Sequence, residues 1–120
     1  AADRLSPDDP MVWALRAELH ARWAMIAPEH WALAEAACRR TLELAPNIAA
    51  YHTALGLVLA RQGRLEAGAA ELERAVALDA TDAVAYRHLA EAYRALGRAD
   101  DAAWALGEAE RWAQEGGGGE

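Results

Sequence analysis

Apolar side chains recur every three or four residues along most of the chain, which is the period of a helix with one buried face. Helix-breaking residues interrupt this period at Pro28, Pro46, Gly63 and Gly97, and a further break falls at 80–82. The Ala-rich composition, from which Phe is absent, also favours helices over sheets. The pattern therefore predicts an all-α fold of six helices.

The first helix has a clear start signal. Asp9 is a good N-cap, and Pro10 suits the first helical position, so we expect this helix to run from there to just before Pro28. One face of the helix carries large side chains, here called the apolar stripe: Val12, Leu15, Leu19, Trp23 and Ile26. The opposite face is nearly all small and consists of Ala14, Ala17, Ala21, Ala24 and Met25.

The rest of the chain repeats itself. The segment 54–64 returns as 88–98, and the spacing of about 34 residues is typical of stacked helical hairpins. The helices that follow also stay in step, as the pairs Gly68 and Ala102, Leu72 and Leu106, and Ala75 and Ala109 show. One period earlier the same steps fall on Ala34 and Thr41, so a third, more divergent repeat comes first.

These residues resemble the tetratricopeptide repeat (TPR) family over nearly the whole chain. The repeat at 83–116 carries the family positions most completely, at Tyr86, Leu89, Ala90, Tyr93, Gly97, Ala102, Leu106 and Ala109. A second repeat lies at 49–82 and a divergent one at 15–48. The resemblance implies a right-handed α-solenoid of three antiparallel helix hairpins. We expect one TPR domain at 10–115, between an N-terminal tail at 1–9 and a flexible Gly-rich tail at 116–120.

The sequence departs from the family pattern at several positions. His52 stands at an aromatic position, and Ala80 stands where the family usually has Pro. Ala21 and Arg22 take the large and small positions of the first helix, so its rotation stays open. Elsewhere small residues predict close helix approach, with large residues filling the space between helices. The small residues are Gly56, Gly68, Ala90 and Ala102, and the large ones are Leu55, Tyr86, Leu89 and Tyr93.

Stacked hairpins curve. In the TPR family the first helix of each hairpin, here called the opening helix, lines a concave groove that binds a peptide or helix of another protein. The groove positions of the family fall here on Arg16, Leu19, Trp23, Ile26, Thr53, Leu57, Arg61, Arg87, Glu91 and Arg94. The resemblance thus implies a protein–protein interaction module. The Lys and Asn with which some members hold a chaperone's C-terminal carboxylate are absent at the matching positions, so that specificity is not expected.

The apolar stripe leaves three interpretations open. It faces the groove and binds a partner if the helix docks through its small face, and it is ordinary core if the helix is rotated. Alternatively, residues outside this chain cover it, since the start without Met and the Gly-rich end suggest a piece of a longer protein. The end near Trp104 and Trp112 is also apolar, although solenoid ends usually carry a polar cap. The alternative functions are therefore self-association, a segment of a longer solenoid, or a regulatory or recruiting appendage of a larger multidomain enzyme.

Charge and composition narrow the class of partner and the compartment. A formal net charge of −7 and a pI near 5.0 disfavour nucleic acid as a partner. No segment has the pattern of a signal peptide or a membrane span. The single cysteine, Cys38, cannot form an internal disulfide, so we expect a cytoplasmic protein. Every basic residue is Arg and Ala is abundant, as a GC-rich bacterial genome would encode.

The sequence predicts no enzyme activity, metal site or cofactor. Ser6 lies in the expected tail, Cys38 has no evident His and acid partners, and the terminal glycines do not form a phosphate-binding loop. His88 and Glu91 form a His-x-x-Glu pair, but no further ligand joins them in the pattern.

Overall fold

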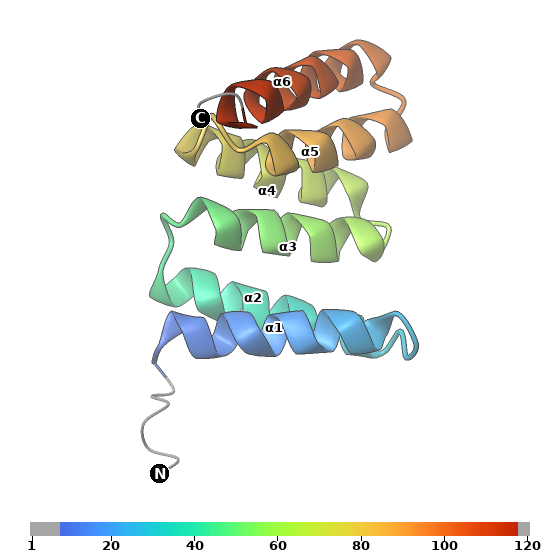
Figure 1. The fold of residues 1–120 in the computed structure, drawn as a ribbon. Coiled ribbons are helices and arrows are strands. Elements are labelled where there is room, and N and C mark those ends of the chain that lie inside the picture. Colours follow the sequence, from blue (N-terminus) through green and yellow to red (C-terminus); the bar gives the residue numbers. More distant parts are fainter. Residues whose placement is uncertain (1–7, 118–120) are drawn as a thin grey trace.

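A computed structural model describes residues 8–117, and this part of the chain consists of six α-helices without a strand. The helices are stacked in chain order from α1 at one end to α6 at the other (Figure 1). The all-α, six-helix prediction is confirmed. The helices are α1 Pro10–Ala24, α2 His30–Leu44, α3 Ala49–Arg61, α4 Leu65–Leu78, α5 Ala83–Ala95 and α6 Ala99–Gly117.

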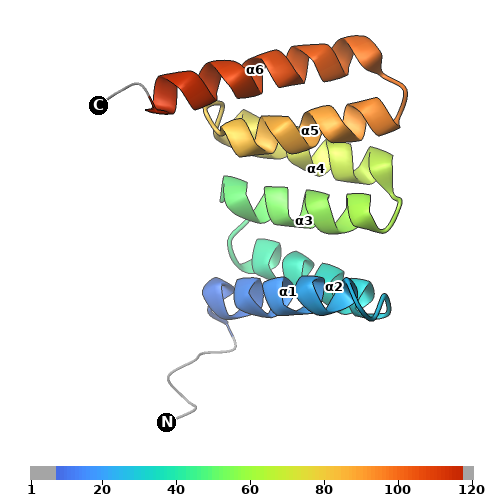
Figure 2. The same cartoon turned by 45° about the vertical axis from the view of Figure 1, so that its right-hand side comes forward.

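The six helices form three hairpins. The most extensive contacts join α1 with α2, α3 with α4, and α5 with α6, while smaller seams join α2 with α3 and α4 with α5. Successive helices lie across the stack in alternating directions, and the turned view shows the same layering (Figure 2). The second helix of one hairpin, here called the closing helix, therefore packs against the opening helix of the next hairpin.

Local turn chemistry fixes where several helices begin and end. A carboxylate oxygen of Asp9 accepts a hydrogen bond from the Met11 N–H at 2.9 Å, which confirms the predicted N-cap of α1. Asp82 caps α5 in the same way. Gly63 and Gly97 have φ of 84° and 80°, a left-handed conformation that glycine adopts without a steric penalty. Each of these glycines turns the chain within a hairpin.

The core lies where the repeat pattern predicts it. The four small residues at the predicted close approaches are buried, and so are the four large residues that fill the space between helices. The α3–α4 approach is especially close, because a Cβ atom built on Gly56 would lie 2.9 Å from the Gly68 carbonyl oxygen. Small side chains at these positions allow the helix backbones to come near each other.

The first helix does not follow the repeat register. That register puts Arg22 at a buried small position, but Arg22 is exposed and forms an ion pair with Glu18 at 2.9 Å. The helix instead buries Ala17 and Ala24. Ala17 packs in one cluster with Cys38 of α2, because small side chains on both helices allow close contact.

Two helix ends differ from the predicted bounds. The first helix ends at Ala24, because the Met25 and Ile26 N–H groups bond to carbonyls three residues back rather than four. The last helix reaches Gly117, two residues into the expected tail at 116–120. The remainder of that tail, and 1–7 of the N-terminal tail, lie outside the described residues. Within 8–117, no helix combines the length and apolarity needed to cross a membrane.

Candidate functional site

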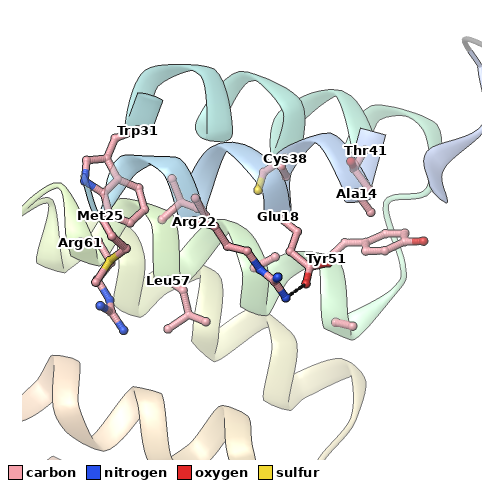
Figure 3. Close-up of a pocket in the computed structure, with 15 residues that line it drawn as sticks. Ala14, Glu18, Arg22, Met25, Trp31, Cys38, Thr41, Tyr51, Leu57 and Arg61 are labelled. Atoms are coloured by element: carbon pink, nitrogen blue, oxygen red, sulfur yellow. Dashed lines mark hydrogen bonds and ion pairs between the residues drawn. The ribbon is translucent and has the colours of Figure 1, made fainter. Parts of the chain in front are cut away.

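An open pocket of about 550 Å³ lies between α1, α2 and α3. Its walls are mainly apolar, and they come from all three helices (Figure 3). A volume of this size is in the range of roughly 300–1,000 Å³ that is typical of ligand pockets. The first helix contributes Ala14, Ala17, Glu18, Ala21, Arg22 and Met25, the second Trp31, Cys38 and Thr41, and the third Ala50, Tyr51, Ala54, Leu57, Val58 and Arg61.

Buried residues of α2 and α3 line the inner part of the pocket and are chemically quiet. The Thr41 hydroxyl is buried and donates a hydrogen bond to the Ala37 carbonyl oxygen at 2.8 Å. Burial raises the pKa of the Cys38 thiol to about 12, so the thiol stays protonated at neutral pH. Val58 is buried beside them. These groups offer a ligand apolar contact rather than a nucleophile.

Charged and flexible side chains form the rim. The Glu18–Arg22 ion pair lies on the α1 side, and Arg61 extends from α3 on the other side. Met25 is 68% exposed and lies near Trp31 and Arg61 at one end of the pocket. The rim thus combines an adaptable apolar group with two guanidinium groups.

A carboxylate fixes α2 against the end of α3 beside the pocket. Glu35 of α2 accepts hydrogen bonds from Gln62 at 3.0 Å and from Arg64 at 2.7 Å, both of which follow α3. It also accepts one from Arg39 at 2.9 Å. Burial by itself would raise the pKa of Glu35, but these three hydrogen bonds outweigh it and the pKa lies below its ordinary value. The Glu35 contacts therefore hold two pocket walls together.

Only two of the ten predicted groove residues, Leu57 and Arg61, line this pocket. The four from the first helix and the turn after it do not line the pocket, and all four are exposed: Arg16, Leu19, Trp23 and Ile26. Leu19 is 56% exposed and Ile26 is 88% exposed. The interpretation of the apolar stripe as ordinary core is therefore wrong, and the stripe does not face this pocket. The cause is that α1 packs on α2 through its small face, at Ala17 and Ala24.

The third-repeat residues lie on α5, away from the pocket. Arg87, Glu91 and Arg94 are exposed, and neither arginine takes part in an ion pair with another residue of 8–117. Glu91 lies 3.6 Å from Nδ1 of His88. Thr53 is half-buried on α3, and its hydroxyl has no hydrogen-bond partner within the described residues.

The histidines form contacts but no ligand cluster. Nδ1 of His20 lies 3.1 Å from Nδ1 of His30, and the two rings stack beside Trp23. Across residues 8–117, no group of three His, Cys, Asp or Glu side chains converges as metal ligands would. The helical spacing predicts the pairing of His88 with Glu91, but not the contact between His20 and His30, because these two residues are separated by the turn between α1 and α2.

The pocket includes residues that the sequence pattern does not assign to a site, notably Glu18, Arg22, Met25 and Tyr51. Met25 was placed on the small face expected to pack against the second helix. The continuous small face of α1 was the one sequence feature that could have indicated the pocket, since small residues leave room for a ligand. Its meaning depended on where α3 lies.

The likeness to known proteins is structural. No protein-family model matches the sequence, and no curated protein matches it. The crystal structure of MamA is similar with a TM-score of 0.78 and 20% identity, over 91% of this chain and 61% of that one. TTC0263, a thermophilic TPR protein of Thermus thermophilus, is similar with a TM-score of 0.79 and 24% identity, over 90% of this chain and 58% of that one.

These likenesses show that the chain has the TPR-type solenoid fold, as the resemblance implied. The chain spans about three fifths of the length of the two solved chains. Identities of 20% and 24% concern the fold, and they carry no partner or activity from those proteins to this one.

Proposed function

We propose that the chain is a non-catalytic protein-interaction module whose α1–α3 pocket takes a large apolar side chain of a partner protein. One observation carries the proposal: an open, mainly apolar pocket lies beside the opening helices of a helical-repeat fold. Anchor residues that fill such pockets usually contribute most of the binding energy of an interface. The partner segment is a helix or an extended peptide.

Exposed arginines on α3 and α5 support acidic residues beside the apolar anchor of that segment. Arg61 lies on the pocket rim, and Arg87 and Arg94 are exposed on α5. None of the three forms an ion pair within 8–117, so each guanidinium group is free to pair with a carboxylate of the partner. The apolar anchor would supply affinity, and the arginines would select charge and register.

The proposal is tested by selecting binders from a displayed library of random peptides on the immobilised chain. Peptides of the expected class carry one large aliphatic or aromatic residue with Asp or Glu nearby. Their affinity is then measured by fluorescence anisotropy for the native chain and for two variants.

The variants Met25→Asp and Ile26→Asp form a matched pair. The two residues are adjacent, apolar and exposed, but only Met25 lines the pocket. Met25→Asp should weaken peptide binding at least about tenfold, the equivalent of about 1.4 kcal/mol, because it puts a carboxylate on the apolar rim. Ile26→Asp should leave binding unchanged.

Three results would contradict the proposal. Selected peptides would lack a large apolar residue, or they would bind both variants as tightly as the native chain. A loss with Ile26→Asp alone would place the binding surface on the outer side of α1. Arg61→Glu provides an independent check, since it should reverse the preference for acidic over basic flanks.

A further inference from the structure

The seam between the second and third hairpins buries small and large apolar residues of both helices. In the seam between α4 and α5, Ala69 and Leu72 of the closing helix α4 are buried with Leu89 and Ala92 of the opening helix α5. Leu72 and Leu89 are completely buried. The closing helix α4 therefore offers a small residue and a leucine, and the opening helix α5 covers them with apolar side chains.

The outer face of α6 repeats two apolar residues of the α4 side of this seam. The repeat spacing carries Ala69 and Leu72 onto Ala103 and Leu106 of α6. Ala69 is 2% exposed, but Ala103 is exposed, and Leu106 is 38% exposed where Leu72 is 0% exposed. The last closing helix thus carries the same small residue and leucine as α4, with no opening helix of residues 8–117 against it.

The outer face of α1 is the uncovered counterpart at the other end. The first helix packs on α2 through Ala17 and Ala24, so the apolar stripe points away from its hairpin. In α3 the side turned toward the preceding hairpin is apolar and buried, with Leu55 and Val58 in one cluster with α2. The stripe has the same apolar character, but Leu15, Leu19 and Trp23 are 53–57% exposed.

The two end faces complement each other in size and charge. The α1 face presents large side chains, and the α6 face presents small residues at Ala103 and at Gly107, where an added Cβ would meet no neighbour. Arg16 flanks the stripe, and exposed Glu110 lies one turn beyond Leu106. Opposite charges at the edges of two apolar faces favour one relative orientation.

We propose that the chain binds a second copy of itself head to tail, with α6 of one copy on the apolar stripe of the next. The contact would extend the stack by a third closing-to-opening helix seam, similar to the α4–α5 seam. The interface is heterologous, because the two copies use different surfaces. It leaves one free face at each end, so the assembly grows with concentration instead of closing as a dimer.

Light scattering across a concentration series provides the first measurement. The mass of the native chain should rise continuously with concentration. Leu19→Asp blocks only the α1 face and Leu106→Asp blocks only the α6 face, so each variant alone should stay monomeric. Both side chains are partly exposed, and circular dichroism checks that both variants fold.

Mixing the two variants is the decisive step. The α6 face of Leu19→Asp is intact, and so is the α1 face of Leu106→Asp. An equimolar mixture should therefore form 1:1 dimers and nothing larger. Met25→Asp, which alters the pocket but neither end face, should associate like the native chain and so separates this proposal from the proposed function.

Three outcomes would overturn the proposal. The native chain could stay monomeric at every concentration. Leu106→Asp could still associate, which would mean that two copies meet through α1 alone. The mixture could remain monomeric although each variant is folded and blocked, which would exclude a head-to-tail interface.

Discussion

Replacing Gly56 with alanine should destabilise the protein, although alanine is the better helix former. The added Cβ would lie 2.8 Å from Cγ of Leu72 and 2.9 Å from the backbone oxygen of Gly68. Leu72 is completely buried, and the Gly68 oxygen belongs to the α4 backbone, so neither atom can swing aside. The α3 and α4 helices would have to separate to accommodate one methyl group.

Two opposing terms set the magnitude. Alanine in a helix interior is more favourable than glycine by about 1 kcal/mol. Overpacking a core costs about 1–3 kcal/mol, and the upper part of that range applies here because the clash involves backbone. We expect Gly56→Ala to lower the free energy of unfolding by about 1–2 kcal/mol.

Gly107 provides the matched control for the same substitution. It lies inside α6, and a Cβ added there meets nothing within 4 Å. Without a clash only the helix-propensity term remains, so Gly107→Ala should raise the free energy of unfolding by up to about 1 kcal/mol.

Urea unfolding followed by circular dichroism measures both changes, at a concentration low enough to exclude self-association. The difference between the two variants in the free energy of unfolding should be about 2–3 kcal/mol, with opposite signs relative to the native chain. If Gly56→Ala stabilised the chain as much as Gly107→Ala, the α3 and α4 backbones could not be in close contact at Gly56.

Three further changes test single features of the structure. Asp82→Ala removes the cap of the first turn of α5 and should lower the free energy of unfolding by about 1 kcal/mol in urea titrations, whereas Asp82→Asn should retain most of it. Glu35→Gln should destabilise the chain at pH 7, and the difference in the free energy of unfolding should vanish as the pH falls. The pKa of Glu35 is lowered in the folded chain, so its carboxylate contributes stability at pH values above the ordinary pKa of 4.5, and this stability is lost on protonation. Unfolding measured from pH 7 down to about pH 3 checks the sign. Cys38 should react with a thiol reagent at pH 8 only as urea unfolds the chain, because burial holds its pKa at about 12, and rapid labelling of the folded protein would contradict the buried position.

Much of the fold followed from the sequence alone. The breaks at Gly63 and Gly97 gave two turns correctly, because a left-handed residue after a helix is a local requirement that glycine meets. Burial of Gly56 and Gly68 followed from the repeat, since small residues at equal spacing on paired helices indicate close approach. Periodicity and turn chemistry act over a few residues, so the sequence by itself determined the six helices and their order.

The candidate pocket and the rotation of α1 were decided by tertiary structure. Nearly the whole circumference of α1 is apolar or small, so burying the stripe or burying the alanines both agree with the sequence pattern. Packing selects the alanines, because Ala17 and Ala24 let α1 approach α2 closely while the longer side chains would hold the helices apart. That choice leaves Leu19 and Trp23 exposed and opens the pocket between α1 and α3. Residues of three helices form the pocket, and the periodicity along one helix does not determine how the neighbouring helices are oriented against it.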